Sequence, residues 1–123
     1  MDTHAILWWL ADDPRLGKRA RAAISDGRNP VYVSAASAWE IAIKKGLGKL
    51  EAPDGLASVL VEAGFETLPI EFTHAERLAS LPPIHRDPFD RILVAQAQVE
   101  DLVLVTADRT IPRYPVEVLD ALQ

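Results

Sequence analysis

The chain has 123 residues, of which 49% are hydrophobic and 25% charged, with no cysteine and a formal net charge of −5. This composition is typical of one globular domain over residues 1–123 and excludes a disordered chain, a disulfide scaffold and a thiolate metal site. No apolar run approaches the roughly 20 residues of a membrane-spanning helix and no signal peptide is recognisable, so we expect a cytoplasmic protein without a membrane partner.

Turn residues and hydrophobic periodicity predict helices that alternate with strands. Leu16, Ala20 and Ile24 recur every fourth residue, as on an amphipathic helix, and 102–105 is an apolar run typical of a strand buried on both faces. The predicted elements, in chain order, are an apolar helix after Asp2, a helix over 14–24, a strand over 31–33, helices over 34–47 and 54–62, a strand over 65–70, helices that begin near 73 and 88, and strands over 102–105 and 116–118. The alternation predicts an α/β fold with a mostly parallel central sheet between helices.

Two helix starts carry recognisable caps. Thr73 to Glu76 forms a capping-box pattern, and Pro82-Pro83 ends the helix that follows it. Asp87 is a good N-cap, because Pro88 then occupies the first helical position, where its missing N–H costs nothing. Asp90 lies in the first turn of the same helix.

The start of the chain departs from this pattern. A first strand should precede Asp2, yet only Met1 stands ahead of it. We therefore expect that the first strand is truncated ahead of Asp2.

Four acidic residues stand where such a fold brings side chains to the carboxyl edge of its sheet. Asp2 and Asp108 follow strand positions, Glu40 lies on the helix after the strand at 31–33, and Asp90 begins a helix. Clustered carboxylates repel by about 4 kcal/mol per pair at a separation of about 4 Å, so such a cluster takes up protons or cations. Oxygen ligands suit Mg²⁺ and Mn²⁺, which activate water for phosphodiester hydrolysis.

Each of these residues also has a structural interpretation that the sequence leaves open. Glu40 could complete a capping box with Ser37, Asp108 could cap a turn, Asp90 could complement the helix dipole, and Asp2 could be solvated. The three histidines lack ligand-like spacing and are interpreted as surface or supporting residues. The tryptophans favour core or subunit contacts, and the basic residues that could rim a phosphate-binding cleft are Lys44, Lys45, Lys49, Arg86, Arg91, Arg109 and Arg113.

The chain resembles the PIN-domain toxins of bacterial VapBC toxin–antitoxin systems along almost its whole length. The stretches that carry the resemblance are Asp2-Thr3-His4-Ala5 with Leu7-Trp8, Val33-Ser34, Ser37-Ala38-Trp39-Glu40-Ile41, His85-Arg86-Asp87-Pro88-Phe89-Asp90-Arg91 with Ala95-Gln96-Ala97, and Leu104-Val105-Thr106-Ala107-Asp108. Their combination in this order is specific, although no single piece is.

The resemblance implies a three-layer α/β/α fold and a Mg²⁺-dependent endoribonuclease, with Mn²⁺ as a substitute, that acts as the toxin of a type II system. By position, Asp2, Glu40, Asp90 and Asp108 match the acidic metal-binding and catalytic quartet, and Asp87 lies outside it. The implied partners are an RNA substrate, a VapB-type antitoxin and a second copy in a homodimer, with operator DNA bound only through the antitoxin. We hypothesise that metal-activated water cleaves the RNA.

Two competing interpretations remain at this stage. A non-catalytic PIN-like module that binds protein or nucleic acid predicts no metal-dependent turnover, and a phosphatase or DNase on the same carboxylates predicts another substrate. A phosphatase of the haloacid dehalogenase type is disfavoured, because His4 stands where its motif needs a second Asp.

Overall fold

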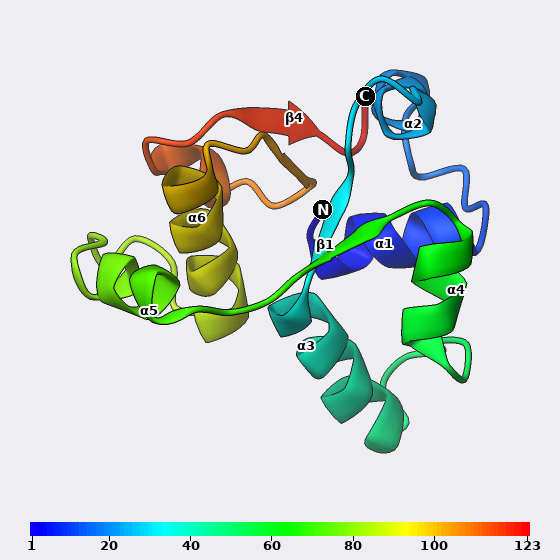
Figure 1. Ribbon diagram of the computed structural model, residues 1–123, viewed down its shortest axis with the longest axis horizontal. Coiled ribbons are helices and arrows are strands. Elements are labelled where there is room, and N and C mark those ends of the chain that lie inside the picture. Colours follow the sequence, from blue (N-terminus) through cyan, green and yellow to red (C-terminus); the bar gives the residue numbers. More distant parts are fainter.

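The computed structural model describes residues 1–123 and contains short strands between longer helices (Figure 1). The elements are α1 (Thr3–Leu10), α2 (Lys18–Ser25), β1 (Tyr32–Ser34), α3 (Ala35–Gly46), α4 (Leu56–Glu62), β2 (Glu66–Leu68), α5 (Phe72–Ala79), α6 (Pro88–Glu100), β3 (Leu104–Thr106), the 3₁₀ turn η1 (Ile111–Arg113) and β4 (Val118–Asp120). No helix is both long enough and apolar enough to cross a membrane.

The strands form two parallel ladders. β1 pairs with β2, so that Val33 lies opposite Thr67, and β3 pairs with β4, so that Val105 lies opposite Leu119. The start of the chain bridges the two ladders, because the Asp2 N–H donates to the Val105 carbonyl at 2.9 Å and the Met1 nitrogen to the Tyr32 carbonyl at 3.3 Å. The parallel strand direction predicted from the sequence is confirmed.

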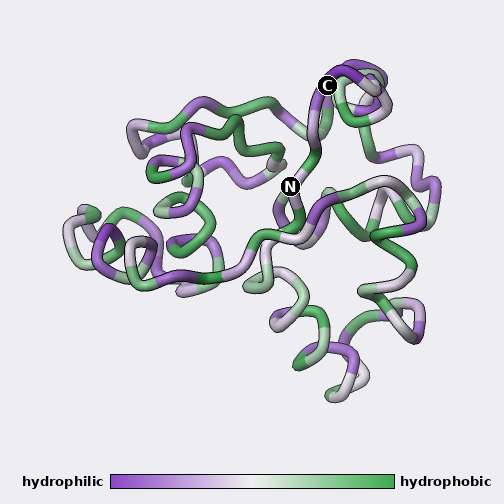
Figure 2. The backbone as a smooth tube through the Cα atoms, viewed as in Figure 1, coloured by the Kyte–Doolittle hydropathy of each residue, from purple (hydrophilic) through white to green (hydrophobic).

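Two apolar cores flank these ladders, and Figure 2 shows hydrophobic residues in both halves of the molecule. One core contains Ile6, Leu16, Val33 and Phe65, from α1 to the start of β2. The other is built around α6, where Val94 and Ala95 are fully buried. The middle of α6, from Ile92 to Ala97, is buried in this core, and the first turn of the helix lies at its partly exposed end.

Two predicted capping boxes are wrong in detail. Ser34, not Ser37, caps α3, because β1 runs directly into the helix and the Ser34 hydroxyl accepts from the Ala36 N–H at 3.0 Å. Glu40 therefore lies in the middle of α3. The box of α5 pairs Glu71 with His74 rather than starting at Thr73, since the His74 ring accepts from the Glu71 N–H at 2.9 Å.

Several element boundaries also differ from prediction: the strand predicted over 65–70 is only Glu66–Leu68, and the one predicted over 102–105 is Leu104–Thr106, with Val103 exposed. α2 begins only at Lys18, because Asp13 accepts the Arg15 N–H at 2.9 Å and fixes a turn where the helix was expected. The last strand, predicted over 116–118, is β4 over Val118–Asp120, since η1 takes up the chain before it.

Candidate metal centre

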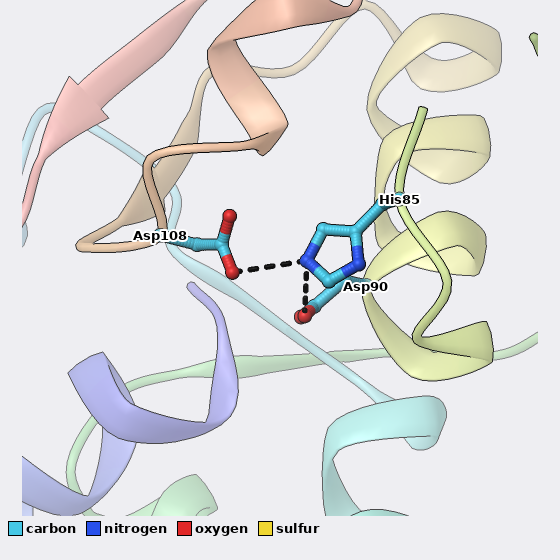
Figure 3. A group of neighbouring side chains, drawn as sticks. All are labelled: His85, Asp90 and Asp108. Carbon is cyan, nitrogen blue, oxygen red and sulfur yellow. Dashed lines mark hydrogen bonds and ion pairs between the residues drawn. The ribbon is translucent and has the colours of Figure 1, made fainter. Parts of the chain in front are cut away.

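The first turn of α6 aims an acidic side chain at the carboxyl edge of the sheet. The Asp87 carboxylate accepts from the Phe89 N–H at 2.8 Å and the Asp90 N–H at 3.4 Å, and Pro88 occupies the first turn, as predicted. With Asp87 holding the free backbone donors, the Asp90 side chain is not used as a cap. It points instead toward the loop after β3 (Figure 3).

Asp108 fixes that loop and faces Asp90. Its Oδ1 accepts from the Thr110 N–H at 2.7 Å and the Ile111 N–H at 3.1 Å, which is the turn-capping role left open by the sequence. The Thr106 hydroxyl accepts from the Asp108 N–H at 2.9 Å. Because one carboxylate oxygen is held by the backbone, Oδ2 has a defined direction into the site.

His85 lies between the two carboxylates. Its Nε2 is 3.0 Å from Asp108 Oδ2 and 3.1 Å from Asp90 Oδ2 (Figure 3). Its Nδ1 accepts from the Asp87 N–H at 3.0 Å, so that nitrogen carries a lone pair and the proton of the neutral ring lies on Nε2. The ring therefore presents an N–H donor at the point where the two carboxylates converge.

The carboxyl groups of this cluster have pKa values displaced in opposite directions. Burial, followed by the negative charge of Asp87, raises the pKa of Asp90 from 3.8 to about 7, against the opposing effect of His85. Burial alone would raise the pKa of Asp108, but hydrogen bonds from His85, Thr110 and Ile111 outweigh it and lower that pKa. The raised pKa of Asp90 thus reflects burial first and neighbouring negative charge second, and a bound cation would oppose both effects.

Asp2 lies beside this cluster and is held by two partners. It caps α1, accepting from the Ala5 N–H at 3.0 Å, and its other oxygen accepts from the Thr106 hydroxyl. The side chain is buried, and its charge contributes to the raised pKa of Asp90. Asp2 is therefore a fixed carboxylate within electrostatic reach of Asp90.

Glu40 is also buried near the site, but both of its oxygens are engaged. Oε1 accepts from the Thr3 hydroxyl, and Oε2 forms an ion pair with Lys44 Nζ at 2.6 Å. The hydrogen bond that Lys44 donates to Glu40, and beyond it the charges of Asp87 and Asp90, raise the pKa of Lys44. Glu40 thus holds the ammonium group of Lys44 at the edge of the acidic cluster.

The structure brings three side chains together closely enough to hold a metal ion. One donor atom from each of His85, Asp90 and Asp108 lies within 4.8 Å of the others. The Ser37 hydroxyl, one turn before Glu40 on α3, is buried without a hydrogen-bond partner and is thus an unused polar group on that helix. Carboxylate oxygens suit a hard divalent cation, so Asp90 and Asp108 fit a metal such as Mg²⁺ or Mn²⁺.

Sequence reasoning missed His85 as a member of the cluster. The ring reaches the carboxylates because the loop before α6 folds back, with the His85 N–H donating to the Tyr114 hydroxyl at 2.7 Å. A usable signal was present, since His85 stands two residues before the N-cap Asp87, and Asp87 binds its ring.

Comparison with known proteins identifies the family. The family model described as the PIN domain matches residues 1–117. This chain belongs to the PIN-domain family. The resemblance found in the sequence is thereby confirmed for the family and for its α/β fold.

This PIN domain is also similar to the protein named Ribonuclease VapC16 from Mycobacterium tuberculosis. The two are 43% identical over 79 residues, which cover 57% of this chain and 56% of the relative. The match thus spans about half the length of that ribonuclease.

Proposed function

We propose that this PIN domain is a Mg²⁺-dependent endoribonuclease that acts in the cytoplasm as the toxin of a type II toxin–antitoxin system. The observation that carries the proposal is the convergence of Asp90 and Asp108 on one point, 3.1 and 3.0 Å from the same nitrogen of His85. The partial similarity to a protein named as a ribonuclease supports the same activity.

Asp90 and Asp108 are the side chains that would hold the metal, with Asp2 beside them. A bound Mg²⁺ supplies Lewis acidity, which lowers the pKa of water and neutralises charge on a phosphodiester. Mn²⁺, with the same preference for oxygen ligands, is the expected substitute. In the neutral tautomer of His85, Nε2 carries a proton and not a lone pair. We therefore propose that His85 is no metal ligand, and that its N–H is a placeholder that bonds Asp90 and Asp108 when no metal is bound.

The remaining residues of the site hold these carboxylates in place. Thr106 links the Asp2 carboxylate to the backbone of Asp108, because its hydroxyl donates to Asp2 and accepts from the Asp108 N–H. Glu40 positions Lys44 at the rim through their 2.6 Å ion pair. We expect Glu40 to act at the edge of the site, either on a metal or on a water, once Lys44 turns toward a phosphate.

The substrate class follows from the charges around the carboxylates. Arg86, Arg109 and Arg113 are exposed, and the first two directly follow His85 and Asp108 in the chain. Arginine side chains bind phosphates in two-pronged contacts, which position a nucleic-acid backbone without reading its sequence. We propose single-stranded or looped RNA as the substrate, since its bases can be splayed away from a backbone held there.

We further propose a VapB-type antitoxin as the inhibitor and a homodimer as the assembly, with operator DNA bound only through the antitoxin. A guanidinium of the antitoxin could occupy the place of the His85 N–H, because it pairs with two carboxylates at once. Such a group would compete directly with a metal for Asp90 and Asp108.

The test is cleavage of a total-RNA pool by the purified protein with Mg²⁺, Mn²⁺ or EDTA. Asp90→Asn is compared with Asp54→Asn, the same substitution at an ion-paired but fully exposed carboxylate. Cuts at discrete positions with either metal are expected from the wild type and Asp54→Asn. Because metal catalysis contributes several kcal/mol, Asp90→Asn should cut about 100-fold more slowly or not at all.

One observation favours a second candidate, a non-catalytic module that binds protein or nucleic acid. His85 and Lys44 already satisfy Asp90, Asp108 and Glu40 without a metal. This candidate predicts that no metal produces turnover in the wild type, whereas a DNase or phosphatase on the same carboxylates would cut DNA or release phosphate in parallel assays.

A further inference from the structure

Trp39 is the largest side chain of α3, yet 59% of its surface is exposed. The other two tryptophans pack against the first core and are partly covered. The Arg15 guanidinium lies 5.2 Å from the centre of the Trp8 ring, and the Phe65 ring lies 5.8 Å from that of Trp9. Trp39 therefore differs from both, because it belongs to neither core.

Phe89 supports the Trp39 ring at the junction between α3 and α6. The two ring centres are 5.0 Å apart and the ring planes are inclined by 80°, which is an edge-to-face contact. Such a contact covers at most one face of the indole, so the other face is open to solvent. Phe89 is itself partly buried, and its N–H donates to Asp87 at 2.8 Å, so the support is fixed in place.

Both aromatic rings stand next to residues of the acidic site. Trp39 directly precedes Glu40, and Phe89 directly precedes Asp90. Because the side chains of a helix lean toward its N-terminus, Trp39 leans over Ala35 toward the end of β1, where α3 begins. The open face of the indole therefore lies at the border of the acidic site and not at the far end of α3.

The surroundings of Trp39 are charged rather than apolar. Lys44 Nζ pairs with Glu40 at 2.6 Å, and the charges of Asp87 and Asp90 on α6 also act on this lysine. The core of a protein interface is depleted of charged residues, whereas sites for single-stranded nucleic acids combine basic side chains with exposed aromatic rings. The residues around Trp39 fit a site of the second kind.

We propose that the open face of Trp39 stacks on the base of a nucleotide next to the phosphodiester held at Asp90 and Asp108, an inference that rests on the proposed nuclease function. Because base and backbone are covalently joined, a fixed base limits where the phosphate lies. The stack requires an unpaired base, since a base inside a duplex is already stacked on its neighbours. Trp39 is therefore a substrate-binding residue that selects single-stranded RNA and accepts any base.

The exposed side of α3 continues beyond Trp39. Ile43 and Leu47 are 42% and 64% exposed and follow Trp39 at intervals of four residues, so the three side chains lie along the same side of the helix. Such a stripe could also be covered by a second copy of the chain. The two occupants make different predictions, because a protein interface uses the whole stripe, whereas base stacking uses Trp39 alone.

The test measures RNA binding separately from RNA cleavage. The protein carries Asp90→Asn and is kept in EDTA, so that it neither cuts RNA nor repels it through an ionised Asp90. Two fluorescent probes are titrated: an oligouridylate of about ten nucleotides, and a sugar–phosphate backbone of the same length without bases. Fluorescence anisotropy gives the dissociation constant of each.

Adding Trp39→Ala should weaken binding of the oligouridylate by about 10-fold and leave binding of the base-free backbone within about twofold. Trp39→Phe should recover most of the loss, because a phenyl ring still stacks on a base. Leu47→Ala, about two turns farther along the helix, is the matched control and should bind both probes as the parent protein does.

Equal weakening of both probes by Trp39→Ala, or equal affinity of the parent protein for the two probes, would overturn the proposal. Equal losses in Trp39→Ala and Leu47→Ala, with a dimer that dissociates in light scattering, would also overturn it by assigning Trp39 to a second copy. Base-dependent binding through Trp39 without cleavage by the wild type would refute the nuclease proposal alone. Cleavage by the wild type without a base-dependent effect of Trp39 would refute only the stacking proposal.

Discussion

The side chains of the acidic cluster determine how the protein responds to pH. The pKa of Asp90 is raised from 3.8 to about 7, so both the folded and unfolded chains are protonated there below about pH 4. As the pH rises from 4 to 7, the unfolded chain loses the proton first and folding weakens, and the loss is complete above 7. Ionisation of Asp90 therefore lowers the free energy of unfolding of the metal-free protein at alkaline pH.

Replacing Asp90 by Asn should remove that penalty. In EDTA at pH 8 we expect Asp90→Asn to be more stable than the wild type by on the order of 2 kcal/mol, after allowance for solvent screening, and near pH 4 to differ little. Urea denaturation at both pH values measures the difference. A variant that is less stable than the wild type at pH 8 would show that Asp90 is not under electrostatic stress.

Metal binding should depend on the same proton. Because a metal requires ionised Asp90, the affinity for Mn²⁺ should rise by about tenfold per unit from pH 5 to pH 7 and level off above about 7. The hydrogen bond to Asp108 and the charges of the nearby carboxylates raise the pKa of His85 against the effect of burial. At low pH, protonation of both Asp90 and His85 should therefore weaken metal binding. Calorimetric titration across this range measures the slope, and a flat profile would contradict the assignment.

His85 can be tested as a placeholder rather than a ligand. At pH 8, where Asp90 is ionised, His85→Ala should bind Mn²⁺ about 3- to 10-fold more tightly, because the competing Nε2–H is gone. The exposed His4 provides a matched control in His4→Ala, which should bind as the wild type does. Weaker binding by His85→Ala would instead make His85 a ligand.

The sequence predicts individual carboxylates better than their arrangement. The capping roles of Asp87 and Asp108 follow from local patterns, because their partners lie two or three residues away. The place of His85 depends on its bond to Tyr114, 29 residues distant, and no local pattern encodes that contact. The engagement of Glu40 by Thr3 likewise arises from packing between α1 and α3.

At the scale of elements, the junction between β1 and α3 holds the sheet against α6. The buried Ser34 hydroxyl accepts from the Ala36 N–H and donates to Gln96 on α6. Ser34→Ala leaves both partners unpaired and should destabilise the protein by about 2 kcal/mol. Urea denaturation at pH 7 measures this loss, with the exposed Ser58→Ala on α4 as the control.

Ser34→Thr keeps the hydroxyl and should recover part of that stability. Equal stability of Ser34→Ala and Ser58→Ala would contradict the assigned role of the junction. The sequence pattern favoured Ser37 as the cap, because Ser37 and Glu40 have capping-box spacing. Tertiary packing decides otherwise, since Ala36 is fully buried and already helical.

For the whole molecule, the order and type of elements were largely predictable from alternating apolar runs and turn residues. Boundaries were not, as α2 and β4 show, because Asp13 and η1 take up residues that periodicity assigns to regular structure. The two ladders are bridged by Met1 and Asp2, which donate to β1 and β3 respectively. Such a bridge is a long-range contact, and strand propensity does not encode it.

The most direct measurement of the central claim is RNA cleavage followed as a function of Mn²⁺ concentration, beside Mn²⁺ binding measured on the same protein. If the metal at Asp90 and Asp108 is catalytic, cleavage and binding should reach half-saturation at the same concentration, and Asp90→Asn should lose both. Cleavage that persists in EDTA, or that is undiminished in Asp90→Asn, would contradict the account.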